Sequence, residues 1–179
     1  MALYTIGDTH LSLGSSKPMD VFGGAWEGYV DKLAQGLSIL QPEDTLVIAG
    51  DISWGMSLEE AEADFAWLDA LPGTKILMKG NHDYWWNTAS KMNRFFQEKG
   101  FTTLRILHNN CHLYGETALC GTRGWFYEED KPGQSQKVFH RELQRLETSL
   151  KAAGDREKLC FLHYPPATPA TAASPFWTC

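Results

Sequence analysis

The chain has 179 residues, of which 43% are hydrophobic and 21% charged, proportions that are typical of a single globular domain. Its formal net charge of -6, without any basic block, excludes a general nucleic-acid footprint. No apolar run approaches the roughly 18 residues of a membrane span and the N-terminus lacks a basic signal-peptide start, so we expect a soluble, cytoplasmic protein without a membrane partner.

The first half of the chain alternates apolar runs with amphipathic stretches. Short apolar runs predict three strands, at 2–6, 45–49 and 75–79. Apolar residues spaced by three and four predict three helices, at 26–40, 58–71 and 88–99. A capping box of Ser57 and Glu60 opens the second helix, and Gly100 closes the third. This β-α-β-α-β-α order predicts an α/β fold with a parallel sheet and helical crossovers.

The second half of the chain has a different pattern. Short β-rich runs broken by turn residues predict strands of a second, partly antiparallel region over 101–126. A long helix is predicted at 135–154, and a strand beginning at Lys158 ends in a loop because two prolines prevent a helix there. We expect one domain over 1–166 and an irregular tail over 167–179.

Polar side chains follow four of the predicted strands at the point where each strand ends. They stand in "YTIGDTH", "VIAGDIS", "ILMKGNHD" and "CFLHYPP", and comprise Asp8, His10, Asp51, Asn81, His82, Asp83 and His163. Ligands of parallel α/β sheets bind just beyond the carboxyl ends of the strands, so these side chains can converge in space. Oxygen and nitrogen donors without a thiolate suit Mn, Fe, Zn, Co or Ni, and the two oxygens of Asp51 could bridge two such ions.

Each of these residues also has an ordinary structural explanation. A strand-end Asp is usually a cap or turn residue, and a single His usually makes a structural hydrogen bond. An unrelated α/β protein with turn acids is therefore one alternative. Four such strand ends in one chain are nevertheless hard to produce by turn chemistry alone.

The ordered motifs D-x-H, G-D, G-N-H-D and a strand-end His resemble those of the calcineurin-like metallophosphoesterases. The stretches "GDTHLS", "KGNHDYWW", "CGTRGW" and "HYPP" resemble a bacterial subgroup of that family. The resemblance implies an α/β/β/α sandwich with a dinuclear metal centre. It also implies hydrolysis of a phosphomonoester or phosphodiester by a metal-bound hydroxide.

The resemblance assigns a role to each ligand in the centre. The two divalent ions would be held by Asp8 and His10 on one side, by Asn81 and His163 on the other, and bridged by Asp51.

Three further residues are candidates for a part in catalysis or substrate binding. His82 would stabilise or protonate the leaving oxygen, since His titrates near neutrality. Asp83 would orient His82. Arg123, in the turn "GTRGW", either contacts a substrate phosphate or is a surface residue beside a packed Trp125.

The chain departs from the family pattern in one respect. The family completes both metal shells with a late G-H-x-H motif, but no His follows His163. We therefore expect a domain that is truncated at its C-terminal side. Three explanations stay open: a truncated sequence, ligands from another chain that associates through exposed sheet edges, or a non-catalytic remnant that binds metal or a phosphate ligand.

Overall fold

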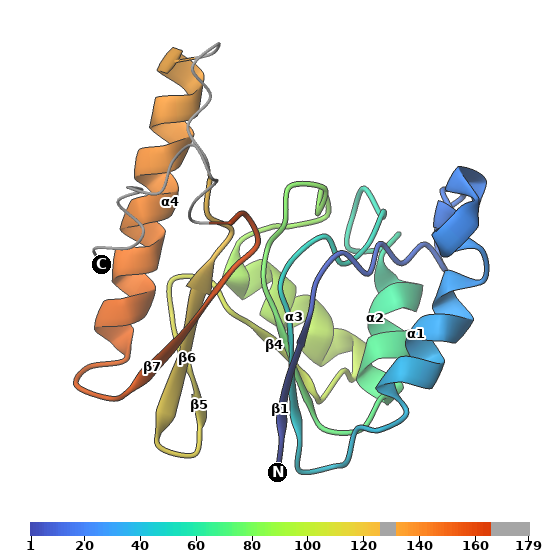
Figure 1. Cartoon of the computed structure of the whole chain (residues 1–179), viewed down its shortest axis with the longest axis horizontal. Helices are drawn as coiled ribbons and strands as arrows, with labels where there is room; N and C mark the ends of the chain where they lie inside the picture. Colours follow the sequence, from blue (N-terminus) through green and yellow to red (C-terminus); the bar gives the residue numbers. More distant parts are fainter. Residues whose placement is uncertain (126–131, 166–179) are drawn as a thin grey trace. The chain divides into compact units, whose positions relative to one another are not determined.

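The computed structural model describes residues 1–125 and 132–165, and the predicted tail over 167–179 lies outside them. The chain divides between Ile106 and Leu107 into two compact units (Figure 1). Each unit combines helix with one β-sheet, which confirms the predicted α/β class. None of the helices in the described ranges is long and apolar enough to cross a bilayer.

The first unit contains a four-stranded parallel sheet in the order β1-β2-β3-β4. Its strands are β1 Leu3–Ile6, β2 Thr45–Ile48, β3 Thr74–Leu77 and β4 Leu104–Ile106. Its α-helices are α1 Tyr29–Leu37, α2 Glu62–Ala70 and α3 Ala89–Lys99. The three predicted strands and the helical crossovers between them are confirmed.

The register of this sheet aligns the ends of all four strands. The last residues of the strands, Ile6, Ile48, Leu77 and Ile106, pair in one row across the sheet. The loops that follow β1, β2 and β3 therefore start side by side, at the carboxyl edge where parallel sheets bind ligands.

The core of the first unit lies on one face of this sheet. Leu46 and Ile48 of β2 and Leu77 of β3 belong to one buried cluster with aromatic residues of α2 and α3, including Phe65 and Phe96. Residues two apart on a strand share a face, so this packing fixes which side of each strand meets the helices.

Two predicted helix starts are wrong. The first helix begins at Tyr29 rather than at 26, because Gly28 adopts a left-handed backbone conformation directly before it. In the second, Ser57 Oγ does accept the amide of Glu60 (3.2 Å). The Glu60 carboxylate, however, accepts the Met56 amide (2.9 Å), and residues 58–61 form a turn before α2.

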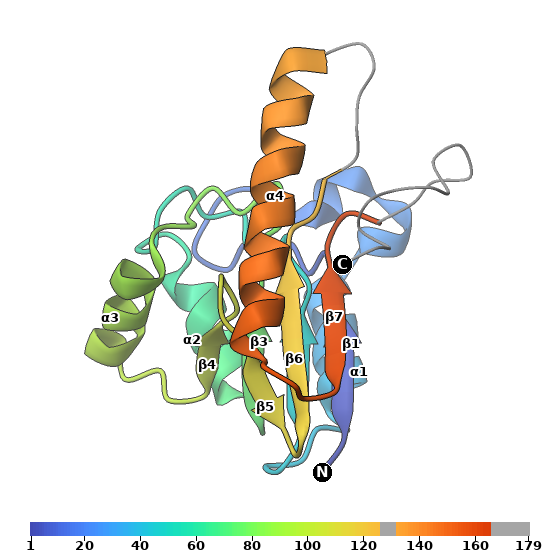
Figure 2. The same cartoon turned by 90° about the vertical axis from the view of Figure 1, so that its left-hand side faces the viewer.

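The second unit contains the strands β5 His112–Tyr114, β6 Thr117–Thr122 and β7 Lys158–Leu162, and the helix α4 Pro132–Ala152. β5 and β6 pair antiparallel, as predicted for this region, while β6 and β7 pair parallel. The parallel pairing requires a crossover, which α4 provides alongside the sheet (Figure 2). Ser149 Oγ of α4 accepts the amide of Gly121 (3.0 Å) and joins the helix to β6.

One strand that was expected in the second region belongs to the first sheet instead. β4 pairs parallel with β3 as its fourth strand. Leu104 and Ile106 are buried and Arg105 between them is exposed, so the alternation fits an edge strand of either sheet. A run of three residues does not encode which sheet it joins.

Candidate metal centre

The loops after β1 and β2 continue the pairing of their strands. The amide of Asp8 donates to the carbonyl of Gly50 (3.0 Å). The amide of His10 donates to the carbonyl of Asp51 (2.9 Å). These bonds hold the predicted ligands Asp8 and His10 directly beside the predicted bridge Asp51.

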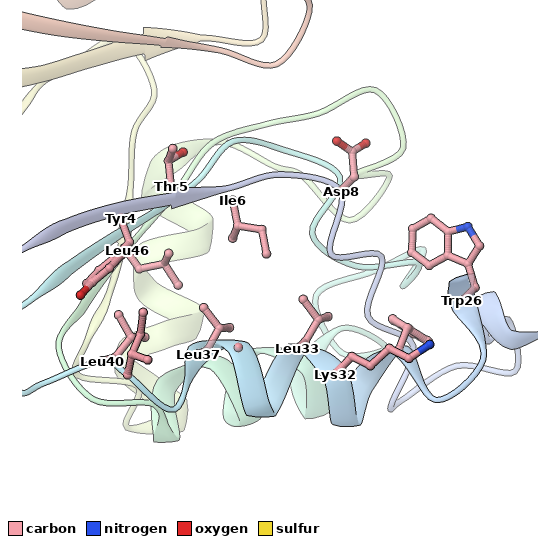
Figure 3. A pocket seen from close by; sticks show the side chains of 13 residues that line it. Tyr4, Thr5, Ile6, Asp8, Trp26, Lys32, Leu33, Leu37, Leu40 and Leu46 are labelled. Atoms are coloured by element: carbon pink, nitrogen blue, oxygen red, sulfur yellow. The ribbon is translucent and has the colours of Figure 1, made fainter. Parts of the chain in front are cut away.

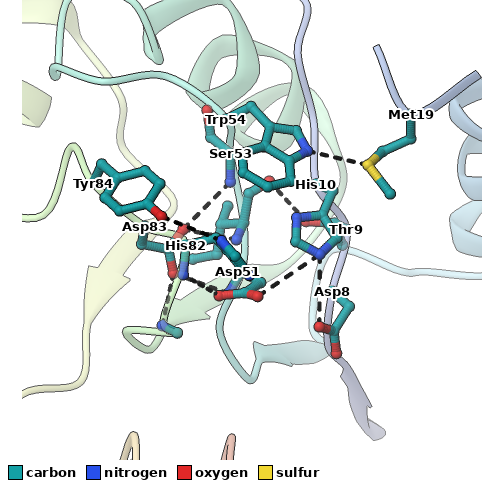
Figure 4. Close-up of polar contacts among 12 residues, drawn as sticks. Asp8, Thr9, His10, Met19, Asp51, Ser53, Trp54, His82, Asp83 and Tyr84 are labelled. Carbon is teal, nitrogen blue, oxygen red and sulfur yellow. Dashed lines mark hydrogen bonds and ion pairs between the residues drawn. The ribbon is translucent and has the colours of Figure 1, made fainter. Parts of the chain in front are cut away.

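The side chains of these three residues converge (Figure 4). His10 Nε2 lies 3.7 Å from Asp8 Oδ1 and 3.7 Å from Asp51 Oδ2. Asp51 and His10 are buried, whereas the Asp8 carboxylate is exposed. Two carboxylate oxygens and an imidazole nitrogen therefore gather at one partly accessible point.

The backbone is strained at the same three residues. Among the described residues, Asp8, His10, Asp51 and Asn109 are the non-glycine residues with positive φ, at 56°, 43°, 53° and 60°. Such conformations cost of order 1–3 kcal/mol each and concentrate at functional sites. We infer that this geometry serves the convergence of the three side chains.

The loop after β3 closes on Asp51. The amide of His82 donates to Asp51 Oδ1 (2.8 Å). A Cβ at Gly80 would clash with the carboxylate and the amide of Asp51, so only glycine permits this approach. Asn81 lies between these two contacts and is half-buried. The predicted ligands of all three strand ends in this unit thus lie in adjoining loops.

Asp83 fastens the second and third loops to each other. Its fully buried carboxylate accepts the amides of Asp51 (2.9 Å), Ile52 (2.8 Å) and Gly80 (2.7 Å) and the indole N–H of Trp85 (3.0 Å). Burial raises the pKa of Asp83 to about 6, against the opposing effect of these hydrogen bonds. These contacts support a role for Asp83 in positioning Asp51, and its predicted action on His82 remains a prediction.

Aromatic rings surround the two histidines. The His10 ring stacks on Trp54 with 4.9 Å between ring centroids, and the His82 ring lies 5.0 Å from the same indole. His82 Nδ1 is 3.5 Å from the hydroxyl of Tyr84, and the Trp54 indole N–H donates to the sulfur of Met19 (3.1 Å). Trp54 therefore contacts both a predicted ligand and the predicted acid.

Sequence reasoning missed two supporting residues. The Tyr29 hydroxyl donates to the carbonyl of His10 (2.9 Å). Asp64 accepts the amide of Leu13 (2.7 Å) and the hydroxyl of Ser53, and burial raises its pKa. The sequence did offer a signal for Asp64, since it is an acid among the buried, mostly apolar residues of α2.

Two predicted residues belong to the second unit. His163 directly follows β7 and is half-buried, with its ring 5.3 Å from that of Tyr164. Arg123 follows β6, and its side chain is only 12% exposed. Its guanidinium pairs with Glu142 (3.3 Å) and lies over the Trp125 ring (4.9 Å). Arg123 is thus largely buried and fixed by its contacts with Glu142 and Trp125, and it is not an exposed surface residue.

The donor set of the first unit fits a divalent cation. Two carboxylates, an imidazole and an amide oxygen are the ligands that borderline and hard divalent ions accept. Hydrogen bonds of their backbone amides and carbonyls help to hold Asp8, His10 and Asp51 in place. A site that is fixed from outside in this way keeps its donor atoms directed at a common point.

Comparison with known proteins identifies relatives of the chain. A sequence model of the calcineurin-like phosphoesterase family matches residues 1–173. Among solved structures, the phosphopantetheinyl hydrolase PptH from Mycobacterium tuberculosis shares 13% identity with a TM-score of 0.58, over 96% of this chain and 71% of that one. A protein of unknown function, AQ665 from Aquifex aeolicus, shares 21% identity with a TM-score of 0.47, over 83% of this chain and 75% of that one. No curated protein matches the chain.

Proposed function

Because the chain belongs to the calcineurin-like phosphoesterase family, we propose that it hydrolyses phosphate esters at a dinuclear metal centre in the loops after β1, β2 and β3. The observation that carries the proposal is the position of His10 Nε2, 3.7 Å from a carboxylate oxygen of both Asp8 and Asp51. In this assignment Asp8 and His10 would hold one ion, and Asp51 would be shared with the second. Asn81 and His163 would be the further ligands of that second ion.

Divalent ions at such a centre neutralise the charge of a phosphate and activate a water for attack. The protein's own contribution begins with Asp51, whose Oδ1 accepts the amide of His82. This bond holds the backbone of His82 against the carboxylate proposed as the bridge. From there the imidazole donates a proton to the leaving oxygen as the ester bond breaks.

Two residues that are not metal ligands support this chemistry. Asp83 accepts the amides of both Asp51 and Gly80, and so fixes the Asp51 carboxylate relative to the loop that contains His82. For Arg123 we propose contact with a substrate phosphate, and its pairing with Glu142 would pre-orient the guanidinium for that contact.

The proposal is tested by metal content and hydrolysis measured on the same preparation. We expect bound Mn after dialysis, and release of p-nitrophenol from p-nitrophenyl phosphate or its bis ester. Asp51→Asn should lose both, because one substitution removes a charged ligand of two ions. Asp155→Asn is the matched control, since Asp155 is exposed in the second unit. Metal binding without hydrolysis of either ester would contradict the enzymatic assignment and favour a binding protein.

A further inference from the structure

The first unit contains a cavity of about 500 Å³ between β1 and α1. Tyr4 and Ile6 line it from β1, and Leu33 and Leu37 line it from α1 (Figure 3). Its volume lies within the range of small-molecule sites, which is roughly 300–1,000 Å³.

The cavity is polar at one end and apolar along the rest of its length. Asp8 and Lys32 lie at the same end as Trp26, whereas Leu40 and Leu46 lie at the other (Figure 3). A nine-residue helix such as α1 spans about 13 Å, so the apolar part is long enough for an extended chain. This distribution matches an amphipathic ligand that has one charged head.

The polar end adjoins the proposed metal centre. Asp8 lines the cavity and is also the carboxylate 3.7 Å from His10 Nε2. Trp26 lines the cavity too, and its ring lies 6.0 Å from the ring of His10. A phosphate held at the centre would therefore have its ester substituent at the mouth of the cavity.

We propose that the substrates are phosphate esters whose alcohol carries an extended apolar arm, and that this arm lies in the cavity between β1 and α1. The inference rests on the proposed function, since it takes the phosphate to be bound beside Asp8. Hydrolysis breaks the P–O ester bond, water supplies the new oxygen on phosphorus, and the apolar alcohol leaves with a proton. The ammonium of Lys32 at the cavity's polar end complements the charge of the head group.

Gly36 offers a way to fill the cavity without disturbing the metal centre. It lies within α1 and lines the cavity, and a Cβ built there meets no atom within 4 Å. Gly36→Phe therefore has room to occupy the place of the arm, while Gly36→Ala adds one methyl group and serves as the matched control. Ile39 lines the same cavity and is 56% exposed, so Ile39→Glu introduces a charge with little effect on folding.

The test compares hydrolysis of ethyl, butyl and octyl phosphate by the Mn-loaded protein, with release of inorganic phosphate as the readout. Each buried methylene is worth roughly three- to fourfold, so two to six additional buried methylenes should raise kcat/KM for octyl phosphate over ethyl phosphate by about 10- to 10³-fold. Gly36→Phe should bring this ratio close to one with ethyl phosphate unchanged, and Gly36→Ala should keep it. Ile39→Glu should also reduce the ratio, and it decides the matter if Gly36→Phe does not fold.

Calorimetric titration with octyl phosphate separates this inference from the proposed function. If no ester is hydrolysed, the proposed function fails, and binding of octyl phosphate that Gly36→Phe abolishes still supports the cavity as the site of the arm. Equal rates for all three esters, or a chain-length preference that neither variant changes, would overturn the inference. So would a dimer that Gly36→Phe dissociates in sedimentation experiments, because a second copy would then be the occupant.

Discussion

Asp83 provides the sharpest test of how the loops are held. Its Oδ1 accepts N–H groups of Ile52 and Trp85 and, at 3.4 Å, that of Ser53. Its Oδ2 accepts those of Asp51 and Gly80. Asp83→Asn keeps the shape but replaces one oxygen by an NH₂ group. Whichever way the amide turns, at least two buried N–H donors lose their acceptor and face another donor.

The magnitude follows from these two donors. A buried donor without an acceptor costs about 1–3 kcal/mol, so Asp83→Asn should lower the free energy of unfolding by about 4 kcal/mol. That is a large share of the roughly 5–15 kcal/mol that stabilises a typical domain. The metal affinity should fall as well, because the backbone of Asp51 loses its anchor.

Urea unfolding in EDTA, followed by tryptophan fluorescence, measures this loss. Five of the seven tryptophans lie in the first unit, so the signal reports mainly on that unit. Asp155→Asn should stay within about 0.5 kcal/mol of the parent protein, as is usual for exposed positions. A change of that small size in Asp83→Asn would refute the role of Asp83 as the fastener of the two loops.

Three other predictions follow from single side chains. If His82 protonates the leaving oxygen, His82→Gln should reduce hydrolysis of alkyl phosphates by about 10²–10⁴-fold. Hydrolysis of p-nitrophenyl phosphate should fall much less, since p-nitrophenolate leaves without a proton. Equal losses for both substrates would contradict this role. Trp54→Ala should weaken Mn binding in calorimetry by about 10–100-fold through loss of the stack on His10, whereas Trp54→Phe should retain most of the affinity. Lys75 is buried and donates to the carbonyls of Asp69, Leu71 and Gly73, and burial lowers its pKa to about 8 from 10.5. Between these two pKa values the unfolded chain binds more protons than the folded one. The free energy of unfolding, relative to that of Lys75→Met, should therefore rise with pH by up to about 3 kcal/mol. Urea unfolding midpoints at pH 7.5, 9 and 10 check the sign.

The sequence predicted the three strands that carry the ligands because the apolar composition of each strand and the residues that end it are local signals. Each apolar run stops at or near a glycine, and the polar residue follows directly. The parallel order of β1, β2 and β3 then brings Asp8, Asp51 and Asn81 to one edge. This part of the candidate site needed no information beyond strand ends and topology.

Other features depend on contacts between distant residues. The stack of Trp54 on His10 and the bond from Tyr29 to the His10 carbonyl each join different loops and helices, which no periodicity encodes. The same limit applies to Asp83, whose partners at Asp51 and Ile52 lie some thirty residues away in the chain. The sequence could indicate that Asp83 was functional, but not that it acts on the backbone of another loop.

Anomalous diffraction from crystals grown with Mn would locate bound ions relative to the side chains proposed as ligands. We expect an ion bound jointly by Asp8, His10 Nε2 and Asp51, and a second ion on the other oxygen of Asp51 together with Asn81 and His163. Density for a second ion that lacks Asn81 and His163 would correct only the outer ligands. Mn bound elsewhere, with the carboxylates of Asp8 and Asp51 free of metal, would contradict the assignment of these strand ends as a metal centre.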